Sequence, residues 1–151
     1  MPVEQELTVR PLRPDDWVGV VALDTLLTGT GKGPYWKQIL DNFLTKESCL
    51  GLAAEVDGSL GGYLFGELRA FEFGSEQCGW VFSLGVQPGT TRQGVASALL
   101  AEAGHRFRAL GVSKVRTMVR RADVPLLALF RSQSFVGGPF VQLELDIAGA
   151  P

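Results

Sequence analysis

Residues 84–100 read Leu-Gly-Val-Gln-Pro-Gly-Thr-Thr-Arg-Gln-Gly-Val-Ala-Ser-Ala-Leu-Leu, and the rest of the chain can be interpreted from this segment. It overlaps the apolar run 81–86, which is typical of a buried strand. A proline and a glycine then end that strand. From Gly94 onward, apolar residues recur at spacings of three and four, which predicts a helix over 94–110.

The loop that opens this helix has the composition of an anion-binding site. The first backbone N–H groups of a helix lack partners, and the helix dipole places partial positive charge at that end. Gly94, Ala96 and Ser97 have small side chains, so a bulky anion can approach the backbone, and Arg92 adds a positive charge. These features fit a pyrophosphate, although an ordinary strand-to-helix turn has the same residue types. The segment lacks the glycines of the dinucleotide fingerprint and the Gly-Lys-Ser/Thr ending of a P-loop.

The spacing of the segment resembles motif A of the GNAT superfamily of N-acetyltransferases. That motif runs from a strand through Val-x-Pro and Arg/Gln-x-x-Gly-x-Gly/Ala into a helix with paired leucines. The matching residues are Val86, Pro88, Gly94, Ala96, Leu99 and Leu100. Thr91 stands where the family usually has Arg or Gln, and Arg92 lies one residue later.

The resemblance implies that this region binds acetyl-CoA as a co-substrate, chiefly through backbone N–H groups. The residues implied in cofactor binding are Leu84, Val86, Arg92, Gln93, Gly94, Val95, Ala96, Ser97, Asp123 and Phe130. In the family, a backbone N–H on a splayed strand stabilises the oxyanion that forms during acyl transfer. The matching position in this chain is Leu84, which the resemblance therefore implies in catalysis.

A second GNAT signature, Asn-x-x-Ala-x-x-Leu-Tyr with Gly-Phe starting four residues after the Tyr, resembles residues 123–135. Asp123 stands for the Asn that commonly bonds the pantetheine arm, and it can also cap a helix. Phe130 stands for a Tyr that often protonates the leaving thiolate, and Ser134 replaces the glycine. Phenylalanine has no proton to give. Its presence predicts a slower enzyme, a substitute donor, or a module that binds without catalysing.

A general base for the acceptor amine is predicted on the hairpin beside this segment, because an alkylammonium is protonated at neutral pH. If Phe73 pairs with Trp80, Glu67 shares a face with Leu84. A register shift of one residue selects Glu72 instead. Both carboxylates stay open as candidates, and each can equally be a solvated surface group.

The whole chain, residues 1–151, is predicted to form one α+β domain. The expected elements are a strand at 7–10, helices at 17–27 and 34–43, strands at 50–56, 60–73 and 80–86, the helix 94–110, a strand at 113–119, a short helix from Asp123 to Gln133 and a last strand at 140–147. This order resembles the GNAT arrangement, a mixed, mostly antiparallel central sheet flanked by helices. The last strand alternates apolar and polar residues, and its edge leaves a homodimer open.

Composition narrows the function classes. The chain has 151 residues, 46% of them hydrophobic, which suits a compact globular domain. A net charge of −2 without long basic runs argues against nucleic acid as a partner. No apolar stretch has membrane-spanning length and the N-terminus lacks a signal peptide, so a cytoplasmic protein without membrane contact is expected. Two isolated cysteines and a single histidine, His105, argue against a zinc site, and no metal is expected.

The leading interpretation is an N-acetyltransferase that moves an acetyl group from acetyl-CoA to a primary amine by direct attack in a ternary complex. The acceptor can be a small molecule, an amino acid or a protein N-terminus, and the two N-terminal helices with their glycine loop are expected to select it. One alternative is a non-catalytic acyl-CoA-binding module of the same fold, motivated by Phe130 and Thr91. Another is a scaffold domain that has lost the cofactor. A nucleotide-binding function lacks residues for a base or ribose.

Overall fold

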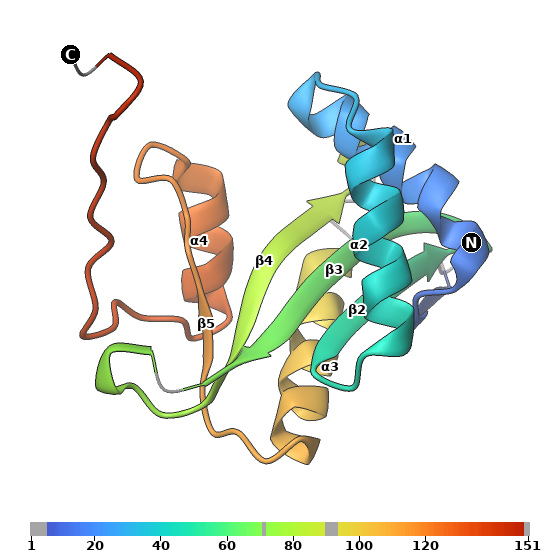
Figure 1. Ribbon diagram of the computed structural model, residues 1–151. Helices are drawn as coiled ribbons and strands as arrows, with labels where there is room; N and C mark the ends of the chain where they lie inside the picture. Colours follow the sequence, from blue (N-terminus) through green and yellow to red (C-terminus); the bar gives the residue numbers. More distant parts are fainter. Residues whose placement is uncertain (1–5, 71, 90–93, 150–151) are drawn as a thin grey trace.

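A five-stranded sheet forms the centre of the computed structural model, which describes residues 6–70, 72–89 and 94–149 (Figure 1). The strands lie in sequence order: β1 (Leu7–Pro11), β2 (Cys49–Val56), β3 (Ser59–Arg69), β4 (Cys78–Val86) and β5 (Val115–Thr117). The first four pair antiparallel, whereas β5 runs parallel to β4. The predicted mixed, mostly antiparallel sheet is confirmed.

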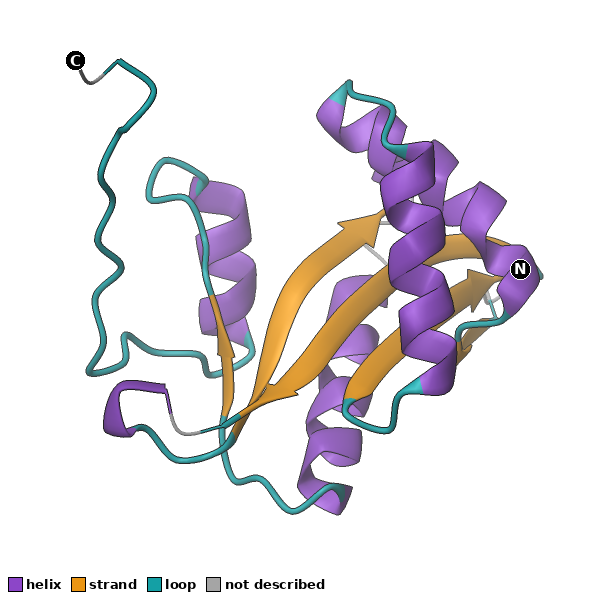
Figure 2. Ribbon diagram, in the orientation of Figure 1, coloured by secondary structure: helices purple, strands orange, loops and turns teal. Residues whose placement is uncertain are grey.

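Helices cover both faces of the sheet (Figure 2). The helices are α1 (Trp17–Thr28), α2 (Gly33–Thr45), α3 (Val95–Ala109) and α4 (Val124–Ser132), with short 3-10 turns η1 (Pro14–Asp16) and η2 (Glu72–Gly74). Helices α1 and α2 pack on one face, and α3 packs on the other, joined there by α4 beside β5. None of the helices in the described part of the chain is both long and apolar enough to cross a membrane.

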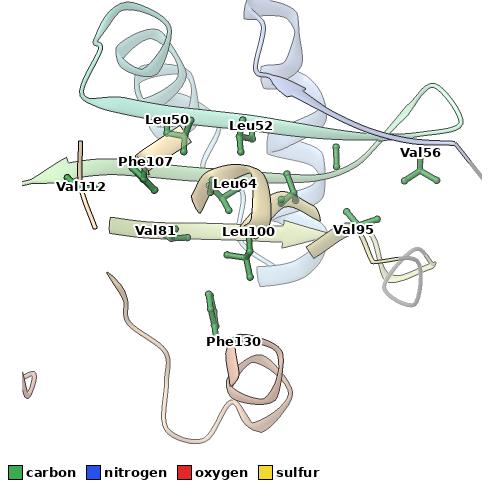
Figure 3. Packing of buried hydrophobic residues seen from close by; sticks show 13 residues of the cluster. Leu50, Leu52, Val56, Leu64, Val81, Val95, Leu100, Phe107, Val112 and Phe130 are labelled. Atoms are coloured by element: carbon green, nitrogen blue, oxygen red, sulfur yellow. The ribbon is translucent and has the colours of Figure 1, made fainter. Parts of the chain in front are cut away.

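Each face of the sheet has its own hydrophobic core. The α3 face is mainly aliphatic, and Figure 3 shows its buried side chains converging between α3 and the strands. The α1–α2 face is aromatic, with the rings of Trp36 and Phe65 5.0 Å apart. Its buried members are Leu12, Val20, Leu23, Trp36, Leu40, Ala53, Tyr63 and Phe65. Alternation of side chains along the strands sends neighbouring residues to different cores.

The predicted strand 60–73 is too long, because β3 ends at Arg69. Phe73 adopts a left-handed conformation with φ 48° and is 97% exposed, so the chain turns there instead of continuing the ladder. The pairing of Phe73 with Trp80 is therefore wrong, and Trp80 lies opposite Glu67.

The predicted last strand, 140–147, is also wrong. No strand lies beside this segment among the described residues, and Figure 1 shows it running away from the sheet beyond α4. The preceding strand is shorter than the predicted range 113–119, since only Val115–Thr117 form β5. An extended segment without an adjacent backbone cannot form a ladder, whatever its side-chain pattern.

The boundaries around the central helix are confirmed. Gly94 is the N-cap of α3 with φ 74°, and Gly111, with φ 93°, follows its C-cap. Asp123 caps α4 as predicted, because its Oδ1 accepts a hydrogen bond of 3.2 Å from Leu126 N. Cys49 and Cys78 are both free thiols.

Candidate active site

Strands β4 and β5 pair over three residues and then diverge (Figure 1). The last pair joins Val81 and Thr117, and Thr117 Oγ1 donates to Val81 O at 2.8 Å. Residues 82–86 continue β4 against β3 but have no strand on their other side within the described residues. One side of the β4 backbone therefore opens toward α4 and the start of α3.

A β-bulge at Phe82 lies where this opening begins. The register places Val81 opposite Gly66 and Ser83 opposite Phe65, which leaves Phe82 as the extra residue. A bulge reverses the alternation of side chains and N–H groups beyond it. Phe82 and the next residue, Ser83, therefore both face the α1–α2 side, where Phe82 packs in the aromatic core and Ser83 hydrogen-bonds to Tyr63, and Leu84 returns to the α3 face.

The N–H groups of Leu84 and Val86 face the opening. Gln87 N donates to Gly61 O at 2.8 Å, which makes that cross-strand pair a hydrogen-bonded one. Hydrogen-bonded and non-hydrogen-bonded pairs alternate along an antiparallel ladder, so residues 84 and 86 turn their N–H groups away from β3. Their side chains pack on the α3 face. The predicted shared face of Leu84 and Glu67 is wrong, because the bulge at Phe82 separates them.

The start of α3 lies at the same end of β4. Gly94 holds a left-handed conformation, and apart from its chain neighbours no atom of the described residues would lie within 4 Å of a Cβ at this position. Val95 is fully buried in the core on the α3 face, so its side chain cannot contact a ligand. Ser97 Oγ accepts a hydrogen bond of 3.0 Å from Gln133 Nε2 and so links α3 to the end of α4. Arg92 and Gln93, predicted to bind the cofactor, lie outside the described residues.

Phe130 is a core side chain in this structure. It is 5% exposed, and its ring lies 5.0 Å from that of Phe135 in an edge-on contact. Figure 3 shows it pointing from α4 toward Leu100 of α3. Ser134 has φ 70°, a conformation that favours glycine and so agrees with the predicted alignment of the second motif.

A buried carboxylate on the other face was missed by the sequence analysis. Asp24 of α1 is 5% exposed, and its Oδ2 accepts a hydrogen bond of 2.7 Å from Trp36 Nε1. Lys32 Nζ lies 3.2 Å from Oδ2, and Tyr63 OH donates to Oδ1 at 3.5 Å. One signal was available, since Asp24 lies at helical spacing from the apolar Val20 on the buried side of α1.

Tyr63 connects this carboxylate to β4. Burial raises the pKa of Tyr63 to about 12, although its hydrogen bond with Ser83 acts in the opposite direction. The phenol therefore stays protonated at neutral pH and can donate to Asp24. Tyr63 lies opposite Gly85, where a Cβ would come within 2.6 Å of the tyrosine ring. The Asp24 cluster thus reaches the backbone next to Leu84.

Glu67 lies farther along the sheet. It is opposite Trp80, four residues before Leu84, which corresponds to roughly 13 Å along a strand. Its Oε1 accepts from Arg69 Nε at 3.2 Å, and the Arg69 guanidinium stacks 4.4 Å from the Trp80 ring. The backbone of Glu72 lies in η2, beyond the end of β3.

Two surface hollows, of about 300 and 260 Å³, lie near the C-terminal half of α3 and do not include Leu84, Val86 or Gly94. No group of three metal-binding side chains is found among residues 6–70, 72–89 and 94–149. The candidate site consists of the open edge of β4 beside the N-terminus of α3. The buried carboxylate of Asp24 lies on the other face of the sheet.

Comparison with known proteins places this geometry in a family. The sequence model of the acetyltransferase (GNAT) family matches residues 17–135, which include the β4–α3 segment and α4. No curated protein sequence matches the chain.

Solved structures share the fold at low sequence identity. The aminoglycoside N-acetyltransferase AAC(6')-Iy, in complex with CoA, is 14% identical with a TM-score of 0.86, over 98% of this chain and 99% of that one. AAC(6')-IG from Acinetobacter haemolyticus is 20% identical with a TM-score of 0.78, over 93% and 99% of the two chains. A protein described as a transcriptional regulator from Bacillus halodurans C-125 is 13% identical with the same TM-score of 0.78, over 94% and 100%.

Proposed function

This chain belongs to the GNAT family of acetyltransferases, and on that basis we propose that it transfers an acetyl group from acetyl-CoA to a primary amine within a ternary complex. The observation that carries the proposal is the divergence of β4 from β5 beside the N-terminus of α3. This arrangement offers two sets of backbone donors at one edge, and backbone donors are what a thioester carbonyl and a pyrophosphate require.

The described residues fit acetyl-CoA. The N–H groups of Leu84 and Val86 would hold the acyl and pantetheine end, because they face the opening without a strand partner among the described residues. The first N–H groups of α3, at Val95, Ala96 and Ser97, would hold the pyrophosphate beside the open space at Gly94. When bound, acetyl-CoA would supply an acetyl thioester, and we propose that Leu84 N–H stabilises negative charge on its carbonyl oxygen. Asp123 is the N-cap of α4, and its carboxylate already accepts a hydrogen bond from Leu126 N.

We further propose that the acceptor is a small amine with at least one additional cationic group. Asp24 is a buried carboxylate whose only cationic partner in the described part of the chain is Lys32. Lys32 lies between α1 and α2, next to Gly31 and Gly33, and its side chain is 38% exposed. An ammonium group of the acceptor can therefore take the place of Lys32 Nζ against Asp24. The aminoglycosides named for several similar structures are amines of this type.

The acceptor amine also needs a general base to remove its proton. Glu67 and Glu72 remain the proposed bases, and Glu67 must leave its ion pair with Arg69 before it can accept a proton.

The cytoplasmic location and the absence of nucleic-acid and membrane partners remain predictions from the sequence.

A non-catalytic acyl-CoA-binding module is the second candidate, and Phe130 favours it because a buried phenylalanine cannot protonate a thiolate. Release of CoA thiol against a panel of amines separates the two functions. If departure of the thiolate limits the rate, Phe130→Tyr is expected to raise kcat by at most about two to four powers of ten. Unchanged kcat in a folded Phe130→Tyr variant would exclude Phe130 as the position of the missing acid.

The cofactor site is tested by a matched pair of glycine variants at the two ends of α3. Gly94→Ala and Gly111→Ala both place a Cβ at positive φ with no atom within 4 Å, so their backbone strain is similar. Only Gly94→Ala adds an atom where the pyrophosphate is proposed to bind, and calorimetry is expected to show a roughly tenfold or greater loss of acetyl-CoA affinity. Equal affinities in the two variants would contradict the proposed phosphate site.

The acceptor site is tested by exchanging the charges of the Asp24–Lys32 pair. Asp24→Asn keeps the shape of the side chain, and it is expected to raise KM for a dicationic amine by about tenfold while KM for a monoamine changes little. Lys32→Met removes the competing cation and is expected to lower KM for the dication. Lys37→Met, in the first turns of α2, is the control, because Lys37 lies over the ring of Trp17 and does not pair with Asp24. If Asp24→Asn changes KM equally for the dicationic amine and the monoamine, Asp24 does not bind the acceptor and its role is only structural.

A further inference from the structure

A side-chain hydrogen bond joins the end of α4 to the first turn of α3. Gln133 Nε2 donates to Ser97 Oγ at 3.0 Å, and both residues are half-buried. Gln133 is the C-cap of α4, and Ser97 is the third residue of α3. The bond therefore connects the far end of α4 with the turn whose backbone N–H groups are proposed to hold the pyrophosphate.

The backbone at the end of α4 fixes the position of Gln133. Ser134, with φ 70°, donates its N–H to Arg131 O at 3.0 Å. Phe135 N donates to Phe130 O, also at 3.0 Å, and the rings of these two residues are in contact. Two such bonds around a left-handed residue, with an apolar contact beside them, form a Schellman motif. Gln133 directly precedes the left-handed residue, so its side chain reaches α3 from a defined backbone.

The Ser97 hydroxyl lies close to backbone donors that the helix itself leaves unused. Ala98 N donates to Gly94 O at 2.9 Å, which is the first bond of the α3 helix after its N-cap. The N–H groups of Val95, Ala96 and Ser97 precede this bond and have no acceptor within the helix. Helical side chains tilt toward the N-terminus, so the short side chain of Ser97 carries its oxygen toward these N–H groups. The first turn of α3 therefore has a hydroxyl beside its backbone donors.

The bond from Gln133 limits where the Ser97 hydroxyl can direct its proton. A serine hydroxyl donates one proton and accepts at its lone pairs. Because Gln133 Nε2 donates to Ser97 Oγ, the hydroxyl proton must point away from Gln133. We propose that Gln133 is a positioning residue for the pyrophosphate of acetyl-CoA, and that its amide directs the Ser97 O–H at a phosphate oxygen. The inference rests on the proposed acetyl-CoA site and adds a side-chain donor to it.

The test compares the binding of acetyl-CoA with that of S-acetylpantetheine, which has the same thioester but no pyrophosphate. Gln133→Met keeps the length of the side chain and removes the N–H donor, so calorimetry should show about three- to tenfold weaker binding of acetyl-CoA. The affinity for S-acetylpantetheine should stay unchanged. Gln133→Glu should weaken acetyl-CoA binding by about thirtyfold or more, because the carboxylate accepts the Ser97 proton and adds negative charge beside the phosphates.

A double variant separates positioning from a structural link between the helices. In a Ser97→Ala background, Gln133→Met should have no further effect on acetyl-CoA binding, because the hydroxyl that Gln133 orients is gone. Gln38→Met is the matched control, since it makes the same substitution at an exposed glutamine of α2. Additive losses in the double variant, or equal losses for acetyl-CoA and S-acetylpantetheine, would overturn the inference.

The outcomes also distinguish this inference from the proposed function. A native protein that binds no acetyl-CoA would overturn both. A native protein that binds acetyl-CoA, with unchanged affinity in Gln133→Met, would overturn the role of Gln133 alone. Ser97→Ala covers the case in which Gln133→Met does not fold, because loss of the hydroxyl should also weaken acetyl-CoA binding by about three- to tenfold. Unchanged binding in Ser97→Ala would overturn the inference as well.

Discussion

The two faces of the sheet are packed by different chemistry. On the α3 face, aliphatic side chains surround Phe107, and the core extends to Phe130 of α4. On the α1–α2 face, Trp36 and Tyr63 belong to an aromatic core and also donate hydrogen bonds to the carboxylate of Asp24. One face buries almost only hydrocarbon, whereas the other holds a charge close to the strand that carries the proposed site.

From this difference we infer that the α3 face mainly contributes stability and that the α1–α2 face mainly affects acceptor binding. A hydrocarbon core stabilises without imposing a direction on polar groups, so the α3 face can hold β4 and the start of α3 rigidly. A buried carboxylate contributes little net stability but orients the donors around it. We therefore expect changes on the α3 face to affect unfolding, and changes on the α1–α2 face to affect the acceptor at smaller cost in stability.

The largest effect is expected for Phe107→Ala on the α3 face. Phe107 is fully buried, and its ring fills the space left beside Gly66 and Gly79. Loss of the ring leaves a cavity, so the free energy of unfolding should fall by about 3–5 kcal/mol, as measured by urea denaturation. Leu110→Ala, at a side chain that is 42% exposed on the same helical segment, should cost much less. Similar costs for both variants would argue against a core centred on Phe107.

A pair of glycine substitutions compares the faces directly. An added Cβ at Gly79 would lie 2.5 Å from the Phe107 ring, and one at Gly85 would lie 2.6 Å from the Tyr63 ring. Each variant, Gly79→Ala and Gly85→Ala, should lose about 1–3 kcal/mol of stability through overpacking. Gly85→Ala alone should also raise the acceptor KM, because it displaces Tyr63 from Asp24. Equal KM values in steady-state kinetics would remove the distinction between the faces.

The smallest expected effect is the loss of stability at acidic pH that comes from Asp16 on the α1–α2 face. Asp16 accepts two hydrogen bonds from Arg10, at 2.7 and 2.9 Å, and Arg10 also donates to Glu55 at 2.7 Å. Burial acts to raise the pKa of Asp16, but the bonds from Arg10 and from the backbone of Arg13 outweigh it and lower the pKa. A lowered carboxylate pKa stabilises the fold above the ordinary value of 3.8 and loses that contribution as the pH falls through the folded-state value.

Asp16→Asn should therefore cost about 1–2 kcal/mol at neutral pH, and the difference from the native protein should shrink progressively below the ordinary carboxyl pKa. Thermal unfolding followed over pH measures this. Asp15→Asn, at an exposed neighbour, is the control. A constant difference at all pH values would show that the ionised carboxylate is not the source of the effect.

The strand–loop–helix segment and the caps of its helices were predictable from sequence because their causes are local. Gly94 and Gly111 at the ends of α3, and Asp123 at the start of α4, act on backbone groups within about four residues of themselves. The order of elements through α4 follows from periodicity of the same short range. Amino-acid identity alone is sufficient for features of this kind.

Features that depend on residues distant in the chain were predicted wrongly or missed. The bulge at Phe82 depends on pairing with β3, and it moves Leu84 to the face opposite Glu67. The segment 140–147 has a strand pattern, but a pattern does not supply the neighbouring backbone that a strand requires. The Asp24 cluster joins α1, α2 and β3, and its burial exists only once these elements are packed. Local propensity specifies where helices and turns begin, whereas register, burial and partners depend on contacts formed by the folded chain.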